Sequence, residues 1–337
     1  MLPFLAAGVA LAAGPAAPKT KRLPPGPYGR AVMAVAVDPK SPSTVYAGTG
    51  GGAFRSVDGG ATWGLLDPAL AGSSVGAIAV DSSSSDIWVG TGAGIFKKTA
   101  SGVERMALDT EIGGLFVGAL AIDPTQSPTV YAGTGKGIFK SSDGGATWVS
   151  LGRGMTNQFV TTLAIDPSAP ATLYAATNGG GIFKSSDGGA TWKPANEGLK
   201  STIVLALTID RRSPEILYAQ TVEGVFRSSD AGKTWAPVNN GLTSRFALAL
   251  AIDPTSSGTL YAGTASGVFR SADGGASWVA SSTGLTNSFV TVLAVDPSSP
   301  ETLYAGTDGG LFKSTSRGSS WIELKRDGGE RHARAAD

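Results

Sequence analysis

The chain has 337 residues, 48 of them glycine and 19 proline, and its 27 basic residues nearly balance its 26 acidic residues. With 42% hydrophobic and 16% charged residues, it has enough apolar side chain for a folded core and too few charges for a disordered chain. The formal net charge of +1 favours neither nucleic acid nor an anionic membrane as a partner. The lack of cysteine excludes disulfides, thiolate metal sites and a cysteine nucleophile.

Both ends of the chain differ in composition from the rest. Residues 1–17 are apolar, too short to span a bilayer, and carry small residues near their end, as a signal peptide does. We therefore expect export to the periplasm or the medium; the basic n-region is missing, so an Ala-rich disordered leader is the alternative. Residues 18–30 form a Pro-rich connector, and residues 326–337 a polar tail that we expect to be disordered. Because the one histidine, His332, lies in this tail, we expect no cofactor and no metal site.

One sequence unit recurs seven times between residues 31 and 325. Its marker is a phenylalanine followed by Lys or Arg, which recurs every 42 to 44 residues: Phe54, Phe96, Phe139, Phe183, Phe226, Phe269 and Phe312. Each unit begins with an apolar run ending in Asp and continues through a second run such as Leu303-Tyr304-Ala305. Short runs rich in Val, Ile, Tyr, Phe and Thr between Gly, Pro, Asp and Ser are strand signals. The pattern predicts four strands in each unit and no helix.

A four-stranded unit cannot bury both of its faces alone. Neighbouring units must therefore stack, and radial stacking into a closed ring also protects the edges of the sheets. We predict an all-β fold with no membrane span, a single seven-bladed β-propeller over residues 31–325. No strand from one terminus is evident that would complete a blade from the other, and the connector before Arg30 is a candidate for closing the ring.

The turn between the third and fourth strands has its own motif, which in the first unit runs from Ser56 to Trp63. Its aspartate and tryptophan recur as Asp58 and Trp63, Asp143 and Trp148, Asp187 and Trp192, Asp230 and Trp235, and Asp273 and Trp278. The pattern Ser-x-Asp-x-Gly-x-Thr-Trp is similar to the Asp-box, or BNR repeat, of sialidases, sortilin-type receptors, xyloglucan-active family 74 glycoside hydrolases and the photosystem II assembly and stability factor family. We interpret these residues as structural: Asp and Ser bind backbone N–H groups, and Trp packs between blades. Unit 2 has Ala100 and Arg105 for Asp and Trp, and unit 7 has Ser316 for Asp, so we expect looser turns there.

Few residues remain for an active site. All seven tryptophans and six of the seven tyrosines occupy repeat positions, and Phe116, Phe159, Phe246 and Phe289 each lie seven residues before an Asp that ends a first strand. We therefore expect almost no aromatic side chain to be free for stacking on sugars or bases. The likeness to sialidases implies a tyrosine nucleophile, and Tyr28 is the unassigned tyrosine.

The likeness to family 74 implies one catalytic Asp in each of two propellers, and this chain has one propeller. The segment around Asp308 resembles the stretch that carries their first acid, and Glu223 is the other acid in the same loops. We interpret both as solvated loop carboxylates, and therefore predict that the chain is not an enzyme. A glycoside-hydrolase-like protein that uses Asp308 and Glu223 is the alternative.

Propellers bind their partners through the loops around the axis, where the repeat pattern relaxes. The polar residues predicted to contact a partner are Arg30, Lys136, Asn157, Gln158, Asn178, Lys200, Glu223, Arg245, Asn287 and Asp308. With few basic groups among them, this surface suits a protein or peptide more than a nucleic acid. We predict a monomeric, exported, non-catalytic binding scaffold. The alternatives are glycan binding and a purely structural module of an envelope assembly.

Overall fold

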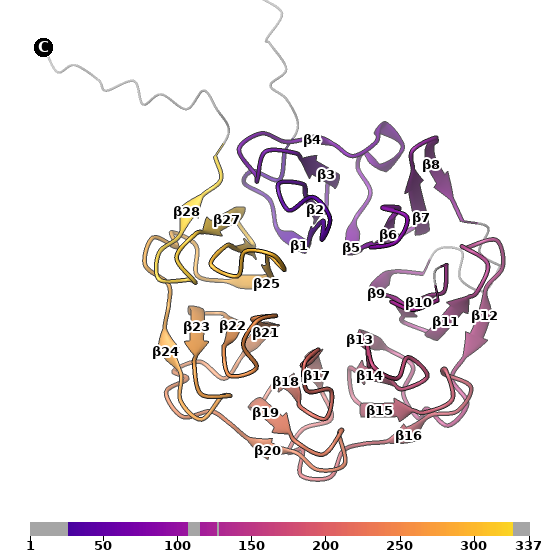
Figure 1. Cartoon of the computed structure of the whole chain (residues 1–337), viewed down its shortest axis with the longest axis vertical. Coiled ribbons are helices and arrows are strands. Elements are labelled where there is room, and N and C mark those ends of the chain that lie inside the picture. Colours follow the sequence, from indigo (N-terminus) through magenta and orange to yellow (C-terminus); the bar gives the residue numbers. More distant parts are fainter. Residues whose placement is uncertain (1–25, 107–114, 127, 326–337) are drawn as a thin grey trace, which may run out of the picture.

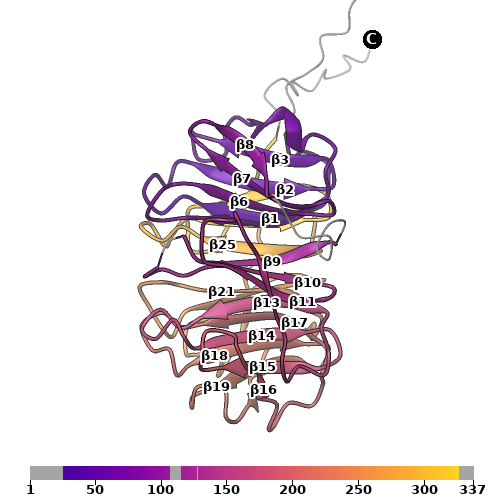
Figure 2. The same ribbon diagram turned by 90° about the vertical axis from the view of Figure 1, so that its right-hand side faces the viewer.

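The predicted propeller is confirmed. In the computed structural model, residues 26–106, 115–126 and 128–325 are described, and they form seven antiparallel sheets of four strands each around a central axis (Figure 1). Seen from the side, the blades form one thick disc (Figure 2). None of the described segments is a helix with the length and hydropathy needed to cross a bilayer. The predicted signal peptide, most of the connector, and the tail with His332 lie outside the described residues.

Each blade consists of four consecutive strands, and the first strand lies nearest the axis (Figure 1). Blade 1 contains β1 (Val32–Val37), β2 (Val45–Thr49), β3 (Gly52–Ser56) and β4 (Gly64–Leu65). The 3-10 helix η1 (Pro68–Leu70) leads to blade 2, with β5 (Val75–Val80), β6 (Ile87–Thr91), β7 (Gly94–Thr99) and β8 (Gly102–Arg105). Blade 3 contains β9 (Val117–Ile122), β10 (Val130–Thr134), β11 (Gly137–Ser141) and β12 (Val149–Leu151). Blade 4 contains β13 (Val160–Ile165), β14 (Leu173–Thr177), β15 (Gly181–Ser185) and β16 (Lys193–Pro194). Blade 5 contains β17 (Val204–Ile209), β18 (Leu217–Thr221), β19 (Gly224–Ser228) and β20 (Ala236–Pro237). Blade 6 contains β21 (Ala247–Ile252), β22 (Leu260–Thr264), β23 (Gly267–Ser271) and β24 (Val279–Ala280). Blade 7 contains β25 (Val290–Val295), β26 (Leu303–Thr307), β27 (Leu311–Ser314) and β28 (Ile322–Glu323).

The core lies between the blades rather than within them. Each apolar cluster combines side chains from two neighbours; between blades 4 and 5, for example, Tyr174 packs in the same cluster as Leu217 and Trp235. The Tyr174 hydroxyl also donates to the carbonyl of Ala231 in the next blade, at 3.0 Å. Lys184 covers the Tyr174 ring and donates to the same carbonyl at 2.8 Å. Burying the aromatic faces therefore ties each blade to the next.

The ring closes without strand exchange, because every sheet is built from consecutive strands. Blades 7 and 1 are instead joined by the contacts that join blades 4 and 5: Tyr304 and Lys313 both donate to the carbonyl of Gly59, at 3.1 and 2.9 Å. The connector residue Tyr28 packs against the apolar cluster between these two blades. Residues 26–30, the described part of the connector, thus add apolar cover at the closure but no strand.

The turns that contain Asp58, Asp143, Asp187, Asp230 and Asp273, here called the aspartate turns, share one hydrogen-bond pattern. In the turn of blade 4, Asp187 accepts the backbone N–H of Thr191 at 2.9 Å, its hydroxyl at 2.6 Å and the Ser185 hydroxyl at 2.8 Å. The Ser185 oxygen accepts the N–H of Gly189 at 2.9 Å. The carboxylate therefore accepts three hydrogen bonds that hold the turn.

The turns of blades 2 and 7, for which the sequence predicts a looser structure, are built differently from the aspartate turns. In blade 7, Ser316 replaces the aspartate but still accepts the backbone N–H of Ser320, at 3.0 Å. In blade 2 the chain makes a short hairpin instead, in which Thr99 pairs with Gly102. A tight hairpin needs no side chain to hold its turn when the strands beside it extend to the turn.

Side chains of complementary size meet where strand two faces the next blade. Gly133 in blade 3 faces Val160 in blade 4, and a Cβ at Gly133 would lie 2.6 Å from the Val160 Cγ1. In blade 5 the sizes are reversed, because the buried Gln220 replaces the glycine and Ala247 in blade 6 replaces the valine. Matching volumes thus keep the blades at a constant spacing.

We expect Gly133→Ala to lower the free energy of unfolding by about 1–3 kcal/mol, because the added methyl group overpacks the contact with Val160. Val160→Ala in the same chain removes the atom that collides, so the double variant should be more stable than the sum of the single effects predicts. Denaturant unfolding of the four proteins measures this. Additive losses would show that the two residues do not compete for space.

Candidate binding face around the propeller axis

The hairpins between strands two and three have a rigid shape in every blade. A buried threonine ends strand two, as Thr221 does in blade 5; its hydroxyl donates to the carbonyl of Gly224 at 3.2 Å and accepts the N–H of Glu223 at 3.0 Å. The same pair of bonds recurs with the following residues: Thr49, Thr91, Thr134, Thr177, Thr264 and Thr307. The tips of these hairpins lie at the end of the disc where the inner strands begin. Together with the loops that lead into the inner strands, they form the axial face.

Large apolar side chains are exposed on this face. At the position just before the inner strand, Phe116 is 45% exposed, Phe159 51%, Ile203 37% and Phe246 42%. These four residues, here called the apolar arc, belong to four consecutive blades, from 3 to 6. The expectation that the repeat leaves almost no aromatic side chain free is therefore wrong. Its cause is geometric: a position that recurs in the repeat is not necessarily a buried position.

Short polar side chains hold the apolar arc in place. The Asn157 carbonyl oxygen accepts the N–H of Phe159 at 2.9 Å, and Ser201 accepts the N–H of Ile203 at 3.1 Å. The Asn157 amide also donates to the carbonyl of Asn178 at 3.1 Å. The polar atoms of Asn157 are thus engaged within the loop. Asn157 accordingly positions the arc, and its counterpart Asn287 does the same for Phe289, at 3.1 Å.

A pocket opens between two members of the arc. It has a volume of about 310 Å³ and is lined by Met33, Gly76, Leu115, Phe116, Gly118, Gly135, Phe159, Val160 and Thr161. Gly76 and Gly118 are the second residues of inner strands β5 and β9, a position that holds Leu205 and Leu248 in blades 5 and 6. The missing side chains leave the hollow, here called the phenylalanine pocket. No motif in the sequence marked it, and the one signal was glycine at a position that holds a larger side chain in the other units.

The other predicted contact residues surround the arc. The structure places the following on the axial face as exposed residues: Arg30, Lys136, Gln158, Asn178, Lys200, Glu223, Arg245 and Asp308. Glu223 and Asp308 lie in the hairpins of blades 5 and 7, with blade 6 between them. The two acids thus belong to hairpins that are not neighbours. Among the described residues, no cluster of three His, Cys, Asp or Glu side chains could hold a metal ion.

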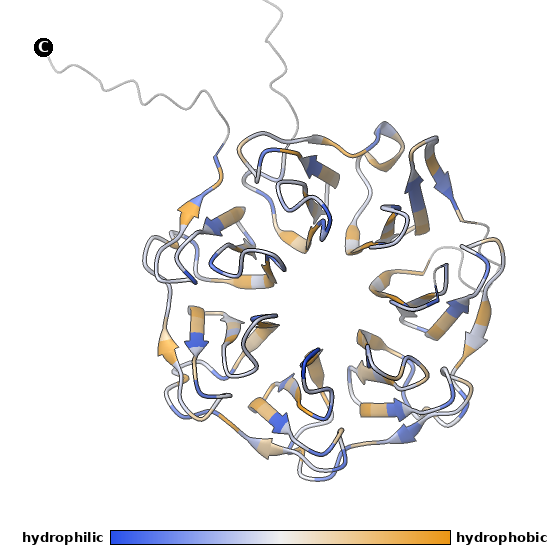
Figure 3. Cartoon of the chain, viewed as in Figure 1, coloured by the Kyte–Doolittle hydropathy of each residue, from blue (hydrophilic) through white to orange (hydrophobic). Residues whose placement is uncertain are grey.

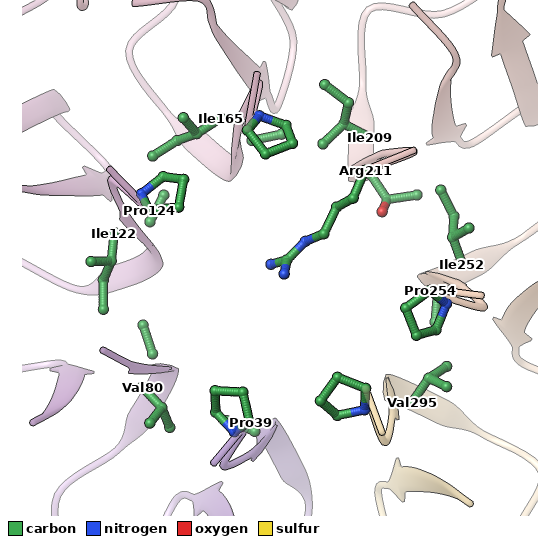
Figure 4. Close-up of a pocket in the computed structure, with 18 of the residues that line it drawn as sticks. Pro39, Val80, Ile122, Pro124, Ile165, Ile209, Arg211, Ile252, Pro254 and Val295 are labelled. Atoms are coloured by element: carbon green, nitrogen blue, oxygen red, sulfur yellow. The ribbon is translucent and has the colours of Figure 1, made fainter. Parts of the chain in front are cut away.

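The opposite end of the axis has a different character. A cavity of about 550 Å³ is lined there by the ends of all seven inner strands and by the residues that follow them (Figure 4). Five blades contribute a proline, namely Pro39, Pro124, Pro167, Pro254 and Pro297, whereas blade 5 contributes Arg211, whose side chain extends into the cavity (Figure 4). Asp210 and Asp253, two of the aspartates that end the inner strands, also line this cavity. Arg211 interrupts the Asp-Pro pattern of five other units, but no motif in the sequence singled it out.

Hydrophobic residues also lie on the outer perimeter, where β24 and β28 carry them (Figure 3). Val279 in β24 is 63% exposed and Ile322 in β28 is 73% exposed. β24 and β28 are the outermost strands of their blades, farthest from the axis (Figure 1). They provide matched controls for substitutions in the apolar arc.

Comparison with known proteins supports the fold. A scan against protein-family models finds no match, and a search of curated proteins finds none either. Among solved structures, an ancestral GH74 enzyme has a TM-score of 0.74 and 19% identity, covering 90% of this chain and 47% of its own. The chain therefore spans about half the length of that enzyme. YCF48 from Cyanidioschyzon merolae has a TM-score of 0.64 and 17% identity, covering 86% of this chain and 97% of its own. A structure of YCF48 bound to D1 peptide matches with a TM-score of 0.64 and 15% identity, over 86% of this chain and 93% of that one. At these identities the likeness is one of fold.

Proposed function

We propose that this chain is a monomeric, non-catalytic scaffold that binds a protein or peptide segment on its axial face. The observation that carries the proposal is the apolar arc, a run of large apolar side chains exposed on a rigid framework. Exposed apolar patches with a polar rim are typical of protein-binding sites. YCF48, which has the same fold over most of this chain, has been solved with a bound peptide. We further propose an extracytoplasmic location, on the strength of the apolar residues 1–17.

Glycan binding is the second candidate, and the same side chains favour it. Exposed phenyl rings such as Phe159 and Phe246 offer flat apolar surfaces that can stack on sugar rings. The fold is shared with a GH74 enzyme. Hydrolysis is not part of this candidate, because a glycosidase pair needs two carboxyl groups roughly 5–9.5 Å apart. Glu223 and Asp308 instead belong to hairpins separated by a whole blade.

The test compares three proteins on a peptide-display library and on a glycan array. They are the wild type, the double variant Phe159→Ser with Phe246→Ser, and the control Val279→Ser, which removes an exposed apolar side chain from the outer strand β24. We expect peptides that bind the wild type and the control with equal affinity and bind the double variant at least about tenfold more weakly, a loss of about 1.4 kcal/mol. Equal binding to all three proteins would place the site elsewhere. Retention of glycans without peptides would favour the second candidate.

A further inference from the structure

The phenylalanine pocket has the size and lining of a site for one side chain. Its volume of about 310 Å³ is at the lower end of the range of roughly 300–1,000 Å³ that small-molecule pockets span. Such a hollow accepts a single large side chain, whereas a folded surface needs a broad, flat contact. Phe116 and Phe159 form its walls, and both side chains are about half exposed.

The side chains that line the pocket offer no free hydrogen-bond donor to a ligand. Thr161 is the residue with a side-chain hydroxyl in the lining, and this hydroxyl already donates to the carbonyl of Val204 at 2.8 Å. Gly76 and Gly118 contribute no side chain, and Met33 and Leu115 are apolar. A polar group placed here would lose its water without gaining a hydrogen bond from these side chains. The lining therefore selects an aromatic or branched aliphatic group.

A cation stands at the rim of the same pocket. Lys136 follows the lining residue Gly135 at the tip of the β10–β11 hairpin, and its backbone N–H is held by Thr134 at 3.0 Å. Its side chain is exposed and makes no ion pair within the part of the chain that the structure describes. The acidic hairpin tips, Glu223 and Asp308, lie in blades 5 and 7, which contribute no residue to the pocket lining. The rim at Lys136 thus favours a negative group beside the apolar one.

We propose that the phenylalanine pocket binds one large apolar side chain of a peptide segment that carries a carboxylate within a residue or two of this anchor, with Lys136 as the partner of the carboxylate. This inference rests on the proposed function and adds the chemistry of the partner. Apolar anchors in a closed pocket supply most of the affinity of peptide interfaces, and rim charges add selectivity. The rest of the apolar arc then extends the contact along the segment.

The test uses a substitution that fills the pocket and leaves Lys136 unchanged. Gly118→Leu introduces the side chain that blades 5 and 6 carry at this position, and a Cβ at Gly118 lies 3.4 Å from the nearest Phe116 carbon, an ordinary contact. Gly118→Ala is the matched control, because it adds the Cβ and leaves most of the hollow open. Thermal unfolding of both variants verifies that they fold. Peptides selected on the wild type from a random library are then measured against each variant.

We expect the selected peptides to share one Phe, Leu, Ile, Trp or Met with Asp or Glu nearby. Their affinity should fall at least about tenfold in Gly118→Leu and about twofold or less in Gly118→Ala. Lys136→Glu should bind the selected peptides more weakly than the wild type does. The same variant should regain affinity for peptides in which Lys replaces the acidic residue. Selected peptides that bind Gly118→Leu as tightly as the wild type would overturn the pocket assignment and leave the proposed function standing. If no peptide is selected at all, the proposed function fails as well.

Discussion

Replacing Trp235 by alanine is expected to lower the free energy of unfolding by about 3–5 kcal/mol. Trp235 is 4% exposed and packs with Tyr174 and Leu217 in the cluster between blades 4 and 5. Its indole N–H also donates to the carbonyl of Ala195 in blade 4, at 2.9 Å. The substitution leaves a large cavity and a buried carbonyl without its partner. The midpoint of denaturant unfolding measures the loss.

Trp192 separates the hydrogen bond from the packing. It is 2% exposed, but its indole nitrogen has no hydrogen-bond partner among the described residues, whereas that of Trp235 is bonded. Phenylalanine at either position removes similar volume. We therefore expect Trp235→Phe to cost at least about 1 kcal/mol more than Trp192→Phe. Equal losses would mean that the bond to Ala195 adds nothing to stability.

The blades could be predicted from the sequence because the features that build them are local and repeated. Tyr174 and Trp235 are buried in the interface between two blades, and the aromatic residues at the same positions of the other units are buried as well. The position of such a residue in the unit therefore indicated its burial. The same rule fails in the loops. Phe159 has counterparts in Phe116, Phe246 and Phe289, yet it is exposed, because it precedes the inner strand at the open end of the disc. Periodicity reports the position of a residue in the repeat, not its contact with water.

The pocket and the opposite cavity depend on differences between units, which a repeat pattern averages away. Gly118 creates the phenylalanine pocket only because Phe116 and Phe159 project beside it from two different blades. Arg211 enters the axial cavity only because the ring brings the ends of all inner strands together. Each depends on contacts between blades, and their residues are far apart in the chain. Such sites can be identified only when the positions of the blades relative to one another are known.

Acid is expected to weaken the propeller through its aspartate turns. Hydrogen bonds from Thr191 and Ser185 lower the pKa of Asp187 to about 2 from its ordinary 3.8. Similar bonds lower the pKa of Asp143, Asp230 and Asp273 to about 2. At Asp58, burial opposes the shift, but the bonds from Thr62 and Ser56 still lower the pKa to about 2.

Because the folded state holds these carboxylates ionised more strongly than the unfolded chain does, their contribution to stability is complete above about pH 4 and disappears as the pH falls towards 2. We expect the melting temperature, followed by circular dichroism, to drop through this interval. Asp187→Asn keeps an acceptor oxygen but not the charge, so its melting temperature at pH 7 should lie below that of the wild type. This difference in melting temperature should shrink as the pH approaches 2. Ser316→Ala, in the turn of blade 7 that has no carboxylate, should instead lower the melting temperature equally at both pH values. A difference between Asp187→Asn and the wild type that stays constant with pH would show that the charge does not stabilise the turn.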